Sequence, residues 1–249
     1  MDTENDDPFR HLPQLREHIA PPERAALRVT PELIAQWDER ARELGHGPDW
    51  RLSNDELEAT RQALLGPWLQ GHDLWVYGYG SLMWDPGFRF AEVRLAELPG
   101  HCRRFAHRTF LGRGSPDNPG LMLTLENGDG CCTGLAFRLG AAWVEQDSGH
   151  LWRREMLRGI YRPGLLPVRT PQGTVTALVF AANPAHEDYL PGLSLQDTAA
   201  MIARARGLIG SNREYLDHLC GQLERLGIAD AHIRALADCV RELAVTPAS

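Results

Sequence analysis

The strongest constraint on the fold is a short apolar run that ends in two glycines separated by one residue. Leu74-Trp-Val-Tyr77 has the length and composition of a buried β-strand, and Gly78-Tyr-Gly-Ser81 follows it directly. Glycines allow a tight turn and a close approach of a ligand, so that successive N–H groups can face an anion or a polarised carbonyl. The loop lacks the Gly-Lys-Ser/Thr of a Walker A motif and the third glycine of a dinucleotide-binding fold. It is therefore either a ligand loop or a structural turn.

Strand-like segments follow this loop, and helical signals flank them on both sides. Strands are expected near 101–110, 120–125, 131–139, 165–170 and 174–182, with a hairpin turn at 171–173. Capping patterns at Thr30-Pro31 and Ser53–Glu56 begin two early helices, and further helices are expected within 141–158 and from Ser194 to about 245, with a capping box at Ser211–Glu214. Residues 1–29 are polar and contain four prolines, which indicates an arm. We predict an α+β fold with an N-terminal extension over 1–70 and a main domain over 71–245.

Glu155 is the candidate acid/base. On a helix at about 100° per residue, its side chain falls on the same side as Trp152 and Met156, whereas Arg153 and Arg154 point away. A carboxylate on a core-facing side loses solvation, which raises its pKa toward neutrality, as a general base needs. The alternative is an inward Glu that is satisfied by an ion pair with a structural Arg. Ser148-Gly149 is a possible break in this helix.

The other chemistry-bearing residues narrow the choice of mechanism. Arg113 lies in a glycine- and proline-rich loop, 113–120, where a ligand-binding Arg is plausible. The histidines show neither HxxxH nor HExxH spacing, so we predict no metal, and no Ser or Cys has a recognisable nucleophile context. By elimination, the residues favour acid/base work by a carboxylate, without a covalent intermediate or a cofactor.

Charge and cysteine content limit the partners. A net charge of −7 argues against a general nucleic-acid or anionic-membrane binder. No apolar run approaches the roughly 18–20 residues of a membrane span, and the acidic N-terminus lacks the features of a signal peptide. Five cysteines form an odd number with no CxxC pair, which is typical of reduced thiols. We expect a cytoplasmic protein with no nucleic-acid or membrane partner.

Taken together, six segments resemble the ChaC family of glutathione-specific γ-glutamylcyclotransferases of the bacterial type. The segments are, in order, 75–84, 103–105, 112–114 with Pro119-Gly120, 134–138, 151–156 and 210–216. The resemblance implies a γ-glutamylcyclotransferase-like mixed β-barrel with flanking helices. It also implies cleavage of glutathione to 5-oxoproline and Cys-Gly, with Glu155 as general acid/base. The residues then expected to bind substrate are Val76, Tyr77, Gly78, Tyr79, Gly80, Ser81, Arg113 and Tyr215.

One position departs from the family pattern. Members of the family carry Arg after the Pro-Gly pair, whereas this chain has Leu121. If that Arg orients substrate, the affinity is lowered here or Arg113 takes over its role. Two alternatives stay open on the sequence: cyclotransfer on other γ-glutamyl amines or amino acids, and a non-catalytic protein that binds γ-glutamyl peptides.

Overall fold

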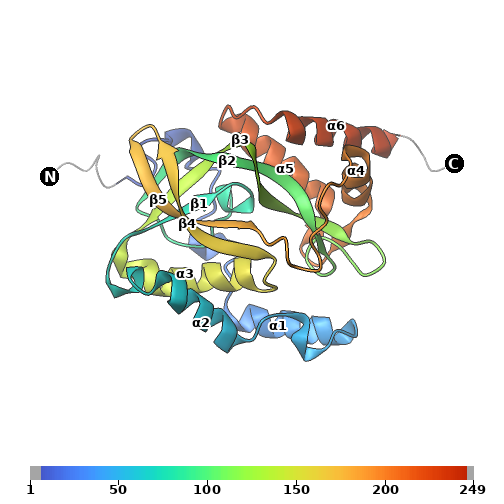
Figure 1. The fold of residues 1–249 in the computed structure, drawn as a ribbon, viewed down its shortest axis with the longest axis horizontal. Helices are drawn as coiled ribbons and strands as arrows, with labels where there is room; N and C mark the ends of the chain where they lie inside the picture. The colour runs from blue at the N-terminus through green and yellow to red at the C-terminus, as the bar shows by residue number, and fades with distance from the viewer. Residues whose placement is uncertain (1–6, 246–249) are drawn as a thin grey trace. The chain divides into compact units, whose positions relative to one another are not determined.

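The structure is a computed structural model that describes residues 7–245, and a closed β-barrel of five strands is its main feature (Figure 1). Around the barrel the strands follow the order β1-β3-β2-β4-β5. Their bounds are β1 Leu74–Gly78, β2 Glu92–Thr109, β3 Gly120–Leu139, β4 Tyr161–Thr170 and β5 Gly173–Ala182. The predicted mixed barrel with flanking helices is confirmed.

Strand β1 is bonded on both sides, as its apolar sequence predicts. It runs antiparallel to β3 and parallel to β5, so that Val76 lies opposite Phe137 on one side and Leu178 on the other. Leu74, Val76 and Tyr77 have no exposed surface. A strand with neighbours on both sides and no solvent-facing side needs an unbroken apolar run, which is what this segment has.

The chain folds as two compact units. One contains the described residues up to Cys102 together with Asn127–Ala181, and it holds the helices α1 Pro31–Glu43, α2 Asn54–Leu65 and α3 Ala141–Met156. The other contains Arg103–Glu126 and the described residues from Ala182 onward, and it holds α4 Leu195–Arg204, α5 Asn212–Arg225 and α6 Ala231–Val245. The long strands β2 and β3 contribute residues to both. The boundary predicted near residue 70 stays a prediction.

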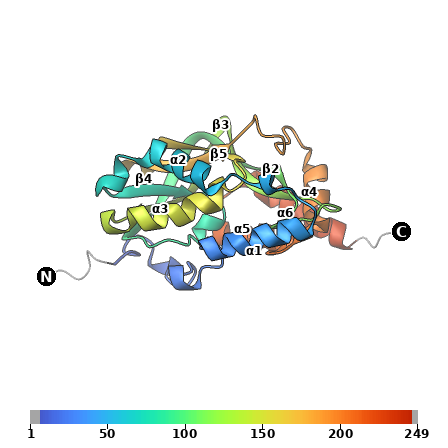
Figure 2. The same ribbon diagram turned by 90° about the horizontal axis from the view of Figure 1, so that it is seen from below.

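The helices of the first unit begin where the capping patterns predict. Thr30 caps α1 by accepting from Leu33 N–H with Pro31 as the first helical residue, and Ser53 and Glu56 form a capping box at the start of α2. Figure 2 shows α2 lying beside α3. Trp152 of α3 is 1% exposed and contacts both α2 and the barrel. Its Nε1 donates to Thr60 Oγ1 of α2 at 3.0 Å, and its ring lies 5.8 Å from the ring of Phe180 in β5.

The segment before α1 is packed, in contrast to the arm expected from its composition. Leu15 has no exposed surface, and 3₁₀ turns form at Pro13–Leu15 and Pro22–Arg24. The segment is also tied to the barrel at Glu92 of β2, whose side chain is 3% exposed and lies 2.5 Å from Arg10. The same carboxylate contacts His11, Arg94 and Arg138. The polar composition of this segment did not predict its packing, because the contacts are made by a few apolar residues and by ion pairs with residues distant in the sequence.

The second unit differs from the sequence expectation in its connections. The two strands expected at 120–125 and 131–139 are one continuous strand, β3. The expected helical run from Ser194 is interrupted after α4 by a short hairpin of β6 Arg206–Gly207 and β7 Gly210–Ser211. The capping box at Ser211 and Glu214 then begins α5, as predicted. Helices α4, α5 and α6 pack against one another (Figure 1).

The first unit also contains short 3₁₀ turns at Pro48–Trp50, Trp68–Gln70 and Ser81–Met83.

Candidate active site

Helix α3 presents Glu155 from its last turn. The helix runs without interruption through Ser148-Gly149, so the expected break is absent and the helical spacing applies over its full length. Trp152 and Met156 are buried, and the Glu155 side chain between them is 14% exposed. Glu155 therefore faces inward, as its spacing from Trp152 predicts.

Arg154 does not point away from the core, and that part of the prediction is wrong. Its side chain is only 7% exposed, and its Nε lies 3.1 Å from Glu155 Oε1. The long side chain reaches the segment after β1, where the main-chain carbonyls of Asp85 and Pro86 accept from its guanidinium. Helical spacing fixes the direction of the Cα–Cβ bond, but four further bonds decide where a guanidinium ends.

Burial dominates the ionisation of Glu155. The loss of solvation raises the pKa of the Glu155 carboxyl, and the adjacent Arg154 charge lowers it by less, so that the net direction is upward. Among residues 7–245, no other cation lies within ion-pair distance of this carboxylate, and Oε2 has no hydrogen-bond partner. The ion pair with Arg that the sequence offered as an alternative is therefore present. It does not cancel the rise in the pKa of Glu155 that burial causes. The result is a carboxylate with an unusually high proton affinity and one unoccupied oxygen.

The glycine loop leaves the barrel at the end of β1 and is held by its two tyrosines. The hydroxyl of Tyr77 donates to Cys132 O at 2.6 Å, and that of Tyr79 donates to Phe180 O at 2.8 Å. Gly80 caps the 3₁₀ turn that follows, and its carbonyl accepts from Met83 N–H. Both phenol groups are buried, and their hydrogen bonds hold the loop against strands β3 and β5 of the barrel. The side chain of Val76 is likewise buried in the strand.

Arg154 connects the glycine loop to Glu155. Its Nη2 donates to Ser81 Oγ at 2.8 Å, and its Nη1 donates to Asp85 O at 2.6 Å. Residues 76–81 and Glu155 lie in the same compact unit. The structure therefore brings two of the predicted elements of the site together through a residue whose helical spacing predicts an outward direction.

Arg113 and Tyr215 belong to the second unit and form a pair there. The guanidinium of Arg113 lies over the Tyr215 ring, 5.7 Å from its centroid, and its Nη1 donates to Ser211 O at 3.2 Å. The nearest carboxylate oxygen, from Glu214, is 3.9 Å away. Burial lowers the pKa of Arg113, and its Nε is buried without a hydrogen-bond partner among the described residues. This guanidinium thus keeps donor capacity for an anionic ligand.

Leu121, at the position where the resemblance leads us to expect Arg, is a core residue. It has no exposed surface, and both of its backbone groups are bonded to the Asn212 side chain. An Arg at this position would have to leave the core to reach a ligand. Arg113 remains the arginine of this loop region with unused donor capacity.

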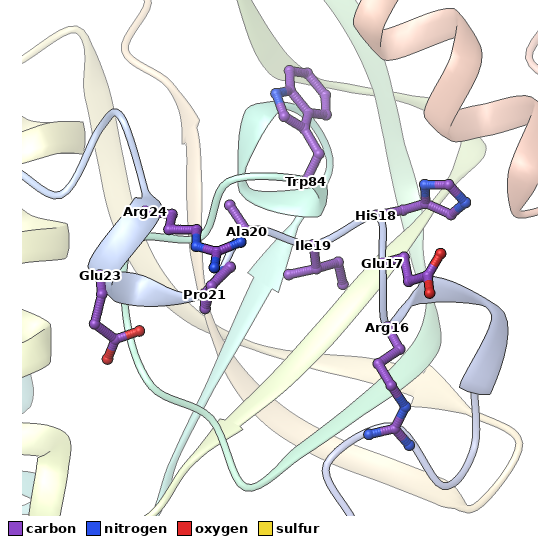
Figure 3. Close-up of a pocket in the computed structure, with 9 residues that line it drawn as sticks. All are labelled: Arg16, Glu17, His18, Ile19, Ala20, Pro21, Glu23, Arg24 and Trp84. Atoms are coloured by element: carbon purple, nitrogen blue, oxygen red, sulfur yellow. The ribbon is translucent and has the colours of Figure 1, made fainter.

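A hollow of about 870 Å³ lies beside the segment that follows the glycine loop (Figure 3). Its lining is formed by Trp84 together with residues 16–21, Glu23 and Arg24, and Ala20 N–H donates to Trp84 O at 2.8 Å. Figure 3 shows the Trp84 indole pointing away from this segment. None of the predicted site residues belongs to the described lining, so the hollow is a separate feature.

The described residues also bear on the expected partners. Within residues 7–245, no three His, Cys, Asp or Glu side chains are grouped as a metal site would require. No helix in the same range is long and apolar enough to cross a membrane. The five cysteines all lie within residues 7–245 and form no disulfide there, and Cys132 is the buried one among them.

The fold has solved relatives. The chain superposes on the crystal structure of a yeast γ-glutamyl cyclotransferase specific to glutathione with a TM-score of 0.63 at 22% identity, over 68% of this chain and 96% of that one. At this identity the match establishes the fold, which is that of a γ-glutamyl cyclotransferase.

Sequence comparison identifies the family. Residues 74–243 match the family model described as ChaC-like protein. The chain is 40% identical over 171 residues to a glutathione-specific γ-glutamylcyclotransferase of Escherichia coli (strain K12), covering 68% of this chain and 74% of that protein. It is 34% identical over 176 residues to glutathione-specific γ-glutamylcyclotransferase 1 of Rattus norvegicus, covering 68% and 79%. The chain belongs to the ChaC-like family.

Proposed function

We propose that this protein is a glutathione-specific γ-glutamylcyclotransferase with Glu155 as its general acid/base. The observation that carries the proposal is the inward Glu155 carboxylate, whose pKa is raised by burial and which is linked through Arg154 to the loop after β1. The names of the curated relatives supply the reaction and the substrate class. A carboxylate with a raised pKa suits proton transfer near neutral pH.

The proposed reaction is an intramolecular acyl transfer. The substrate's α-amine, once deprotonated, attacks its own γ-carbonyl carbon, a C–N bond forms, and a five-membered ring closes. The bond from that carbon to the cysteine nitrogen then breaks, which releases 5-oxoproline and Cys-Gly. No water is consumed and no electrons are transferred. Because the nucleophile and the carbonyl belong to one molecule, holding the cyclic conformer removes much of the entropic barrier.

Glu155 manages the proton in this scheme. The α-ammonium must lose a proton before it can attack, and Oε2 of Glu155 is free to take it. The same proton then passes to the departing nitrogen of Cys-Gly, and the second proton that the ring nitrogen sheds as it becomes the lactam N–H goes to the released amine, which leaves as an ammonium. A raised pKa makes the carboxylate a stronger base toward the ammonium, and the acid that forms can still donate to the departing amine because that amine is more basic than the carboxylate.

The substrate is proposed to be held by the loop 76–81, and Arg113 and Tyr215 stay candidate substrate-binding residues of the second unit. The backbone N–H groups of the loop would bind the γ-glutamyl part and support the oxyanion that develops on the γ-carbonyl oxygen. Arg113 retains an unpaired Nε for a substrate carboxylate. Neither step needs a metal or an organic cofactor.

Product analysis tests the proposal and separates it from its rivals. Glutathione, γ-Glu-Ala and γ-Glu-ε-Lys are incubated with the protein, and 5-oxoproline, glutamate and Cys-Gly are quantified. We expect 5-oxoproline and Cys-Gly in equal amounts from glutathione, and little product from the other two. Equal turnover of all three would indicate a general γ-glutamyl cyclotransferase, and binding without any product would indicate a non-catalytic binder. Glutamate as the first product would indicate a hydrolase instead.

A further inference from the structure

The Arg154 side chain is buried and contacts several groups of the candidate site at once, unlike an exposed cation on the protein surface. Its guanidinium contacts Ser81 Oγ at 2.8 Å, Asp85 O at 2.6 Å and Pro86 O at 3.4 Å, and its Nε lies 3.1 Å from Glu155 Oε1. These partners come from the segment after β1 and from the last turn of α3. A single side chain thus fixes the carboxylate relative to the loop.

We infer that Arg154 is the positioning residue of this site: it holds the Glu155 carboxylate in its ionised form and in register with the glycine loop. The inference rests on the proposed function for its catalytic meaning. Arg suits this task because its planar fork can bond several acceptors at once and stays charged at any accessible pH.

Two opposing effects set the charge of Glu155. Burial favours the neutral carboxyl of Glu155, and Arg154 favours the carboxylate. Asp85 faces the same guanidinium, with its Oδ1 at 4.0 Å. Arg154 is the charged group that the described residues bring within ion-pair distance of Glu155, so its removal leaves burial unopposed. The acid/base group would then stay protonated to a higher pH and could not accept a proton from substrate.

The contacts of Arg154 also fix its geometry. The donors to Asp85 O and Pro86 O fix one end of the guanidinium, and the donor to Ser81 Oγ fixes its other nitrogen. Lysine keeps the charge but is a compact ammonium, which cannot reach all of these acceptors together. Charge and geometry can therefore be separated by substitution.

The experiment compares Arg154→Met, Arg154→Lys and the control Arg153→Gln. Arg153 is the matched neighbour on α3, and its guanidinium contacts Val29 O and His150 Nδ1 rather than Glu155. Two quantities are measured: the pH dependence of kcat/KM for glutathione, and the titration midpoint of the Glu155 side chain by ¹³C NMR of Glu-labelled protein, assigned with Glu155→Gln. Circular dichroism checks that each variant folds.

For Arg154→Met we expect the acidic limb of kcat/KM and the NMR midpoint to rise together by about 1–3 pH units. The activity deficit should shrink as pH rises, because below the midpoint the carboxylate fraction falls about tenfold for each pH unit by which the midpoint rises. Arg153→Gln should leave both quantities unchanged. A deficit that is the same at every pH, with an unmoved midpoint, would overturn the electrostatic role.

Arg154→Lys keeps the inference testable if the Met variant fails to fold. We expect a midpoint within about half a pH unit of the wild type, since the charge is kept, but a lower kcat because the register is lost. Wild-type kcat in the folded Lys variant would overturn the geometric role. The NMR midpoint does not depend on turnover. A wild-type protein that forms no 5-oxoproline but shows the raised midpoint on Arg154→Met would therefore refute the proposed function and leave the link between Arg154 and Glu155 standing.

Discussion

Asn212 holds Leu121 by both of its backbone groups: Asn212 Oδ1 accepts from Leu121 N–H at 2.6 Å, and Asn212 Nδ2 donates to Leu121 O at 2.9 Å. Asn212 is itself fully buried at the first turn of α5. This pair joins a strand to a helix within one compact unit, and it leaves the Leu121 side chain with no path to solvent.

Introducing by Leu121→Arg the arginine that the resemblance leads us to expect should therefore destabilise the protein instead of improving substrate affinity. A guanidinium at a position with no exposed surface loses its hydration, which we expect to cost about 3 kcal/mol or more of unfolding free energy. Urea denaturation measures the loss. Leu121→Met is the control, with an expected cost below about 1.5 kcal/mol. An Arg variant as stable as the wild type and with a lower KM for glutathione would contradict this expectation.

A side chain in the glycine loop should act on substrate binding. Gly80→Val places a β-branched side chain where the backbone is proposed to approach the ligand, so binding of glutathione should be lost in a protein that still folds. Gly164→Val in β4 is the matched control, because a Cβ there meets no atom within 4 Å. Calorimetry with glutathione compares the two. Normal binding by folded Gly80→Val would make the loop a structural turn only.

The Glu92 cluster should make stability depend on acid pH. Burial by itself raises the pKa of Glu92, but hydrogen bonds from Arg94 and Arg138 outweigh it and lower the pKa from 4.5 to about 2. A lowered folded-state pKa stabilises the protein above the unfolded value, and this contribution is lost as pH falls from about 4.5 through 2. We expect Glu92→Gln to cost about 2 kcal/mol at pH 7 and progressively less below pH 4.

Urea denaturation at pH 7 and pH 3 measures that difference. Glu97→Gln is the control, because Glu97 is an exposed carboxylate on the same strand. A cost for Glu92→Gln that is the same at both pH values would show that the cluster contributes through shape and not through the ionised carboxylate.

Local signals in the sequence account for most of the helix starts. A cap at Thr30, Ser53 or Ser211 depends on residues three positions apart, so the sequence contains all that is needed. The buried strand β1 was predictable for the same reason, since an apolar run next to glycines has few alternatives. By contrast, Asn127–Gly130 has the composition of a break between two strands, and yet β3 is continuous there.

The inward position of Glu155 and the loop after β1 were predictable from the sequence, whereas the connection between them was not. Glu155 follows from helical periodicity. The role of Arg154 depends on which acceptors its flexible side chain reaches. One of them, Ser81 Oγ, lies 73 residues earlier in the chain. Such a contact has no signature in local spacing. The one available signal was an Arg directly beside the candidate acid/base.

The central claim is that Glu155 carries the proton in the proposed cyclotransfer, and Glu155→Gln tests it most directly. The amide keeps the shape of the side chain and removes the base, so glutathione should still bind while the initial rate of 5-oxoproline formation falls by about 10²–10⁴. Glu145→Gln is the control on the same helix, since that carboxylate is 63% exposed and should be dispensable for turnover. We predict a folded Glu155→Gln protein that binds glutathione without turning it over. A variant that kept more than about a tenth of the wild-type rate, well above that expected loss, would remove Glu155 from the mechanism.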